Sequence, residues 1–193
     1  MLRKTLLLLL MAAFFTIALN AQTEKGTFSI GLNTGPDLRY SANTGYKGLL
    51  LNGDLRAGYF LKNNLLIGGE FGISRLKLTQ NGEIYASSTG FNSGLFARKY
   101  FDLKNPKWKP FIEVGPGLNH SELSYDSSNN SQINYSRTTG YVRAELGIAY
   151  FINKNTSLNL SYSQQANFGN DLFYKSGGLK FGVHFNFDAK RKK

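Results

Sequence analysis

The sequence predicts an all-β fold built from eight antiparallel strands, and three observations lead to this prediction. Apolar and polar residues alternate with a period of two in eight segments, which is the pattern of strands with one apolar face. No segment after Gln22 has apolar residues at the spacing of a helix. The 193-residue chain is also rich in glycine (21), phenylalanine (15) and tyrosine (11) and poor in proline (4), a composition that favours strands and turns.

The first four expected strands are identified by apolar residues of one parity. They are Gly26–Gly35 with Phe28, Ile30 and Leu32; Leu51–Leu61 with Leu55, Ala57, Tyr59 and Leu61; Leu65–Leu78 with Leu65, Ile67, Phe71 and Ile73; and Ser88–Phe101 with Phe91, Leu95, Ala97 and Phe101. Successive side chains of a strand point to opposite faces, so each segment has one apolar face.

The last four expected strands follow the same rule. They are Pro110–Tyr125 with Ile112, Val114 and Leu118; Arg137–Ile152 with Val142, Ala144, Leu146, Ile148, Tyr150 and Ile152; Thr156–Gln165 with Leu158, Leu160 and Tyr162; and Gly177–Phe187 with Leu179, Phe181, Val183, Phe185 and Phe187. The last of these is the most regular strand of the chain.

The links between these strands alternate in length. Three are short and polar, at 62–64, 102–109 and 153–155, and four are longer, at 36–50, 79–87, 126–136 and 166–174. Outer-membrane barrels have short periplasmic turns, longer external loops and an even number of strands. The sequence therefore predicts an eight-stranded antiparallel up-and-down transmembrane β-barrel with both termini in the periplasm.

The N-terminal segment has the layout of a secretory signal peptide. Arg3 and Lys4 make its start basic, an apolar run follows over Leu6–Leu19, and the small Ala21 precedes the expected cleavage site. The run is shorter than the roughly 20 residues that a spanning helix needs. We therefore expect a cleaved signal rather than an uncleaved anchor. The expected division is a signal peptide at 1–21, the barrel at 22–188 and a basic periplasmic tail at 189–193.

Charge and cysteine content narrow the classes of partner. The formal net charge is +11, and an exported chain does not routinely meet nucleic acid, so the excess favours anionic lipid surfaces. Part of it lies in the tail Lys190–Lys193, which we interpret as a solvated end. The absence of cysteine excludes disulfides, thiolate chemistry and zinc–thiolate sites.

The opposite parity of the strands carries glycines and charges. Glycine on an exposed strand face costs entropy and packs nothing, whereas the interior of an eight-stranded barrel is so narrow that large side chains need small neighbours. We therefore expect this parity to face the lumen, where four acids and four bases pair as a structural charge network. Its candidate members are Asp54, Arg56, Glu70, Arg98, Glu113, Arg143, Glu145 and Lys180.

Two other arrangements of the faces stay open. The charged parity can be a solvated surface, since charged residues on strands are usually exposed. The chain can also be a water-soluble calycin-like barrel with the apolar parity inside and an apolar ligand bound there. In the arrangement that we favour, the apolar parity faces lipid, and an interfacial aromatic belt comprises Tyr59, Phe101, Tyr150, Phe185 and Phe187.

Several stretches also resemble a known family. They are the segment ending Ala21-Gln22, the strand PFIEVGPGLN (Pro110–Asn119), the hairpin GYVRAELGIAYFINKNTSLNLSYS (Gly140–Ser163) and the aromatic-terminated last strand. The chain is similar to the small outer-membrane β-barrel proteins of the Bacteroidota, the porin family with an OmpA-like β-barrel. The resemblance implies an integral outer-membrane barrel in a Gram-negative bacterium. It also implies that Phe185 and Phe187 form the C-terminal signal that the outer-membrane assembly machinery recognises.

Few residues are candidates for catalysis, and we expect no enzyme activity, cofactor or metal. His120, Ser121 and Glu122 are the residue types of a hydrolase triad, and some barrels that resemble this chain are lipid A deacylases with such a trio. On a strand, His120 and Glu122 share a face while Ser121 points away, so a serine from a neighbouring strand would be needed. His184 has the lumen parity, where a single histidine more often satisfies hydrogen bonds than binds a metal.

Three functions are compatible with an outer-membrane barrel of this kind. The first is an integral barrel with a lumen filled by side chains and a structural, adhesive or surface-interaction role. The alternative is a narrow channel that conducts ions or solutes, and the third is an outer-membrane hydrolase that modifies lipids. The expected partners are outer-membrane lipids and, during insertion, the assembly machinery, with no nucleic acid. The sequence identifies no external ligand.

Overall fold

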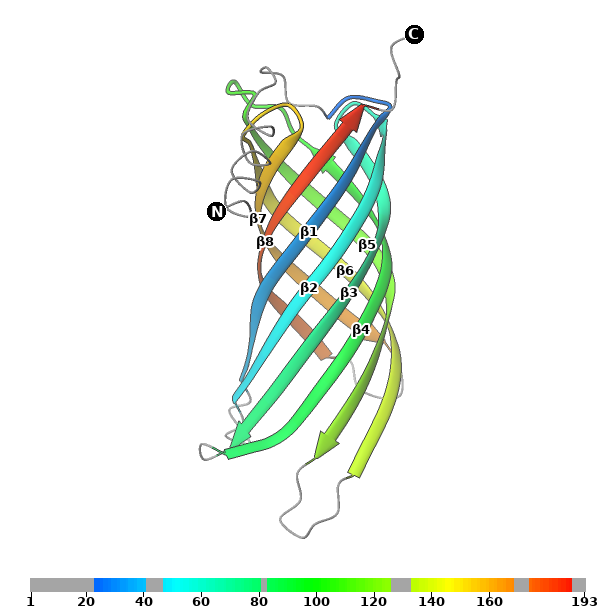
Figure 1. Ribbon diagram of the computed structural model, residues 1–193, viewed down its shortest axis with the longest axis vertical. Helices are drawn as coiled ribbons and strands as arrows, with labels where there is room; N and C mark the ends of the chain where they lie inside the picture. The colour runs from blue at the N-terminus through cyan, green and yellow to red at the C-terminus, as the bar shows by residue number, and fades with distance from the viewer. Residues whose placement is uncertain (1–22, 41–46, 81–82, 126–132, 169–173, 189–193) are drawn as a thin grey trace, which may run out of the picture.

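The computed structural model describes residues 23–40, 47–80, 83–125, 133–168 and 174–188. The eight strands are β1 (Thr27–Tyr40), β2 (Lys47–Lys62), β3 (Leu65–Gln80), β4 (Glu83–Tyr100), β5 (Trp108–Tyr125), β6 (Ile133–Phe151), β7 (Thr156–Phe168) and β8 (Tyr174–Asp188). Each strand pairs antiparallel with the next, and β8 pairs with β1, which closes the barrel (Figure 1). The predicted eight-stranded antiparallel barrel is confirmed. No helix among the described residues is long and apolar enough to span a membrane.

The strands are longer than the alternation of apolar residues predicts. The expected link at 79–87 is wrong, because β4 begins at Glu83 rather than Ser88 and Gln80 pairs with Glu83. The ladder of backbone hydrogen bonds does not depend on side-chain polarity, so paired strands continue past their apolar band. The expected signal peptide (1–21), the basic tail (189–193) and the centres of the remaining long links lie outside the described residues.

The three short links gather at one end of the barrel, which we call the short-turn end and which is uppermost in Figure 1. They connect β2 to β3, β4 to β5 and β6 to β7. In the first of them Asn64 has a φ of 64°, a left-handed conformation that asparagine tolerates better than most residues. We call the opposite end of the barrel the far end.

Exposure in this barrel is the inverse of that in a water-soluble protein. Leu95 and Leu146 are 65% and 63% exposed, whereas Arg56 and Arg98 are 1% and 0% exposed. The apolar parity of every strand thus points outward and the charged parity inward. This arrangement suits a wall in contact with lipid, and it argues against the water-soluble alternative, which would bury the apolar parity.

Aromatic side chains of the outer wall lie near the short-turn end. Phe28 and Tyr59 form a cross-strand pair with ring centroids 5.0 Å apart, and Trp108 and Tyr150 form another at 4.6 Å. Amphipathic rings at this level are typical of the boundary between hydrocarbon and water. The belt therefore marks where the apolar band of the wall ends.

Candidate functional site in the lumen

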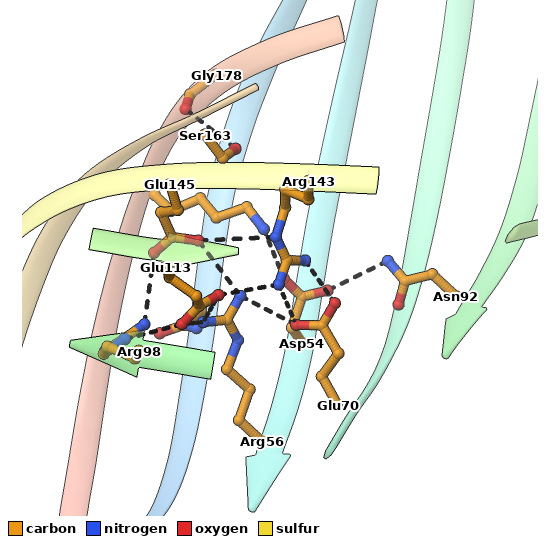
Figure 2. Close-up of polar contacts among 12 residues, drawn as sticks. Asp54, Arg56, Glu70, Asn92, Arg98, Glu113, Arg143, Glu145, Ser163 and Gly178 are labelled. Atoms are coloured by element: carbon orange, nitrogen blue, oxygen red, sulfur yellow. Dashed lines mark hydrogen bonds and ion pairs between the residues drawn. The ribbon is translucent and has the colours of Figure 1, made fainter. Parts of the chain in front are cut away.

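Charged side chains from six strands meet inside the barrel. We call them the lumen charge cluster, and its members are Asp54 and Arg56 of β2, Glu70 of β3, Arg98 of β4, Glu113 of β5, Arg143 and Glu145 of β6 and Lys180 of β8. All eight side chains are buried. Figure 2 shows the arginines and glutamates of this cluster together with Asp54. These are the eight residues that the sequence nominates, and the structure brings them together as two units. Three arginines and three glutamates form one connected set, and Asp54 and Lys180 form a pair.

Glu113 is the hub of the connected set. Its carboxylate accepts hydrogen bonds from Arg56 Nη1 at 3.0 Å, from Arg98 Nε at 2.8 Å and from Arg143 Nη2 at 3.0 Å. Three guanidinium groups therefore converge on one carboxylate, as Figure 2 shows. Removing one partner of a buried ion pair leaves an uncompensated charge, which costs several kcal/mol.

Glu70 and Glu145 balance the remaining positive charge. Arg143 donates to the two carboxylate oxygens of Glu70 at 2.5 and 2.6 Å, and the Tyr141 hydroxyl donates to Glu70 Oε1 at 2.9 Å. Glu145 lies 3.3 Å from Arg56 Nη2 and 3.5 Å from Arg98 Nη2. Since three arginines face three glutamates, the connected set has no net charge, which is the condition under which charges tolerate burial.

Strand register explains part of this pairing. Arg56 lies directly opposite Glu70, and Arg98 lies directly opposite Glu113. The register also places Glu113 opposite Glu145, and like charges in that position repel. Arg56 and Arg98 each contact both of these carboxylates, so the two arginines offset the repulsion.

Hydrogen bonds extend from the cluster toward β1 and β4. Lys180 Nζ lies 3.0 Å from Asp54 Oδ2, and the Asn92 amide donates to Asp54 Oδ1 at 3.3 Å. His184 Nε2 lies 3.1 Å from the side-chain amide of Asn33. When the nitrogen of the Asn33 amide faces His184, the amide oxygen accepts a hydrogen bond from Arg56 Nε at 2.8 Å. His184 is thus a hydrogen-bonded lumen residue, as its parity predicts.

Glycines on the lumen parity make room for the long side chains. A Cβ atom at Gly117 would meet the ring of Tyr141, and one at Gly94 would lie 2.6 Å from the Tyr141 hydroxyl. Tyr141 reaches across to Glu70 because β4 and β5 carry no side chain at these two positions. The small neighbours expected from the sequence therefore have a direct role in placing the network.

An apolar layer fills the lumen between the charge cluster and the short-turn end. It consists of Phe60, Leu66, Phe96, Tyr100, Phe111, Ala149 and Phe151, none of which is more than 3% exposed. The Arg98 guanidinium lies over the Phe111 ring at 3.9 Å, so the layer and the cluster are in contact. The apolar layer is not among the predicted site residues, because apolarity alone assigns such residues to the lipid face. These apolar residues have the same strand parity as the lumen charges, and this shared parity is the sequence signal that places them in the lumen.

A polar cap covers the short-turn end of the lumen. Lys109 Nζ donates to Thr23 Oγ1 at 2.9 Å, to Asn64 Oδ1 at 3.1 Å and to Asp102 Oδ1 at 2.6 Å. Thr23 is 3% exposed and its carbonyl accepts from the backbone of Asn64 at 2.7 Å, which ties the start of the described chain to the turn. The hydrogen bond from Lys109 holds the pKa of Asp102 below its usual range.

Of the residue types of a hydrolase triad on β5, His120 and Glu122 lie on the outer wall. His120 Nδ1 is 2.9 Å from Thr138 Oγ1, and His120 Nε2 is 3.5 Å from the hydroxyl of Ser136 on the neighbouring strand β6. Ser121 has the opposite parity and points away from this group. In a hydrolase triad a carboxylate bonds to one ring nitrogen of the histidine and orients the ring. Here Thr138 bonds to His120 Nδ1 instead, and no carboxylate of the described residues bonds to His120. Within the described ranges no three or more His, Cys, Asp or Glu side chains are grouped to hold a metal.

Comparison with protein families gives one match that covers nearly the whole chain. The family described as the outer membrane protein β-barrel domain matches residues 6–187. No curated protein sequence matches the chain.

The chain has the same fold as a number of solved structures, including the following three. Neisserial surface protein A is 20% identical, and the match covers 84% of this chain and 98% of that chain with a TM-score of 0.58. Ail, the attachment invasion locus protein of Yersinia pestis, is 17% identical, with 84% and 99% covered and a TM-score of 0.54. The outer membrane protein OprG from Pseudomonas aeruginosa is 15% identical, with 88% and 99% covered and a TM-score of 0.51. At these identities the likeness is one of fold.

Proposed function

The chain belongs to the outer membrane protein β-barrel domain family, and from this premise we propose that it is an integral outer-membrane barrel with a sealed lumen. Its role is structural, adhesive or another form of surface interaction, and it is neither an open pore nor an enzyme. The wall of exposed apolar side chains around a charged interior supports the membrane location. The finer placement, an exported protein of the Bacteroidota porin family, is a prediction from the sequence resemblance.

The observation that carries the sealed lumen is the deep burial of two successive layers. In the charge cluster Arg98 and Glu113 are 0% and 2% exposed, and in the apolar layer Phe60 and Phe111 are 1% and 2% exposed. An eight-stranded barrel has an interior just wide enough for its own side chains. These layers leave almost no water-accessible surface on their central residues, so an ion crossing here would have to displace them.

The length of the strands supports a role at the cell surface. A strand of about 9–11 residues crosses the hydrocarbon core, whereas β4 and β5 have 18 residues each and β6 has 19. We propose that the short-turn end faces the periplasm and that the far ends of these strands project from the outer surface. Short periplasmic turns are the rule in barrels of this type.

A narrow channel is the second candidate, and one observation favours it. Each arginine of the connected set contacts at least two glutamates, so a side chain can exchange partners while it stays paired. Such an exchange would open the charge cluster only. The apolar layer, which lies between the charge cluster and the short-turn end, would also have to move before ions pass.

Conductance across planar lipid bilayers tests this proposal. We expect refolded wild-type protein to give no steady single-channel current, because both lumen layers are closed. Steady currents that change with Lys180→Glu in the lumen but not with Lys99→Glu on the outer wall would contradict the sealed lumen and support the channel. Heat-modifiable migration on a gel confirms that each variant is folded.

A further inference from the structure

A groove crosses the outer wall of the barrel over β7, β8, β1, β2 and β3, which are consecutive neighbours in the closed sheet. Its volume is about 750 Å³, and its lining is almost wholly apolar. Exposed side chains form its walls, among them Leu55 and Phe71 on one side and Phe181 on the other. A volume of this size falls within the range of small-molecule sites, which is about 300–1,000 Å³.

The groove exists because two small residues lie side by side between large ones. Strand pairing runs from Phe181 of β8 through Thr34 of β1 and Gly53 of β2 to Ile73 of β3. A Cβ atom at Gly53 would have no other atom within 4 Å, so the space above this residue is open. The low floor is therefore two strands wide, or about 10 Å.

Two cations follow the groove wall on the same strand and face. Arg75 and Lys77 continue the outward parity of Ile73 on β3 toward the far end, and both side chains are exposed. Neither makes an ion pair or hydrogen bond with another described side chain. Through Thr89, the register places the outward carboxylate of Glu122 two strands from Arg75, or about 10 Å away. Among the side chains that the structure describes, the two cations therefore have no neutralising partner.

We propose that this wall binds one phosphorylated, acylated glycolipid of the outer leaflet, that is, lipid A. An acyl chain lies in the groove over Thr34 and Gly53, and a phosphate contacts Arg75 and Lys77. The site rests on the proposed function for the placement of the far end at the outer surface. The apolar groove matches the elongated acyl chain of such a lipid, and the two cations match its anionic phosphate.

The two parts of the site contribute differently. In a bilayer the acyl chain gains no hydrophobic energy, because lipid already covers the wall, so the groove contributes close packing only. Each basic residue near an anionic surface strengthens binding about fivefold. Selectivity for a phosphorylated lipid therefore comes from Arg75 and Lys77, and the position of its chain comes from the groove.

Native mass spectrometry of the refolded full chain in detergent tests the proposal, with bisphosphorylated lipid A, its dephosphorylated form and phosphatidylglycerol as probes. We expect wild-type protein to retain one bisphosphorylated lipid A. Arg75→Gln with Lys77→Gln lowers this retention about twentyfold or more, and Gly53→Leu lowers it by filling the floor. Two matched controls leave it unchanged: Lys99→Gln, a cation on the same wall at the short-turn end, and Gly140→Leu, an outward glycine on β6 that also has no atom near its Cβ position.

Three results would overturn the proposal. Equal loss from Gly53→Leu and Gly140→Leu would mean that the groove is no site. Unchanged retention of lipid A by the Arg75 and Lys77 double variant would mean that these cations do not bind a phosphate. If phosphatidylglycerol is retained as well as bisphosphorylated lipid A, the site is not specific for lipid A and the proposed ligand is wrong. Since these measurements are made in detergent, they are independent of cell fractionation, which tests the proposed membrane location separately.

Discussion

Glu113→Gln is the substitution that most sharply tests the lumen charge cluster. Glutamine has nearly the same size as glutamate, so it leaves no cavity and keeps one acceptor oxygen. It removes the one negative charge on which Arg56, Arg98 and Arg143 converge. The connected set then carries a buried net charge of one, because three arginines face two glutamates.

The expected loss of stability follows from this imbalance. Breaking a buried ion pair by removing one partner costs about 3–5 kcal/mol, and the retained acceptor oxygen places Glu113→Gln near the lower limit. We expect a loss of about 3 kcal/mol, which is about a hundredfold in the ratio of folded to unfolded protein. The assay is equilibrium urea unfolding of protein refolded into lipid vesicles, with Glu122→Gln as the control because Glu122 is exposed on the outer wall of the same strand.

A second variant separates charge balance from packing. Adding Arg98→Gln to Glu113→Gln restores the balance of charges, so the double variant should lose clearly less stability than the sum of the two single variants. If Glu113→Gln costs no more than Glu122→Gln, or if the two lumen substitutions are simply additive, the buried network is not what stabilises the barrel.

Three other predictions concern the rest of the lumen and the last strand. Phe111→Ala should cost about 3–5 kcal/mol in the same unfolding assay, whereas Phe91→Ala on the outer wall should cost far less. Asp102→Asn should lower stability at neutral pH. Because the pKa of Asp102 is lowered in the folded state, this difference is full above the usual aspartate value of 3.8 and disappears as the pH falls through the lowered value, which a pH series of unfolding curves measures. Deleting residues 185–187 should reduce the yield of assembled barrel in the outer membrane far more than deleting residues 188–193, and equal yields would rule out an assembly signal at Phe185 and Phe187.

Strand parity predicts the faces of this barrel well and its side-chain partners poorly. A period of two places Arg56 and Glu113 on the same side of the wall, and that is enough to expect a charged lumen. Which acid meets which base depends on strand stagger, which no single segment encodes. Arg143 reaches Glu70 of β3 across the lumen, 73 residues away in sequence, and only the closed barrel brings them together.

The apolar layer escapes prediction for a different reason. In a membrane barrel, apolar residues belong to both faces, so apolarity does not decide which way Phe60 or Phe111 points. Parity does decide it, since Phe60 is four residues from Arg56 and Phe111 is two residues from Glu113. Counting from the charges rather than from the apolar run would have placed both rings in the lumen.

The ends of the strands and the outer groove require information that alternation lacks. Polar residues beyond the lipid band, such as Gln80 and Glu83, still pair, because their backbone groups need partners whatever their side chains are. The groove depends on Thr34 and Gly53 lying in one row of a particular register. The sequence shows each small residue but not that they are neighbours.

In the arrangement that we propose, the apolar parity of the strands faces lipid and the charged parity faces a sealed interior. Cell fractionation combined with gel migration before and after heating tests it most directly, because only a barrel folded in membrane shows both properties. We expect the protein to be found in the outer-membrane fraction and heating to change its migration. A protein that stays in the soluble fraction without detergent would contradict the assignment of both faces.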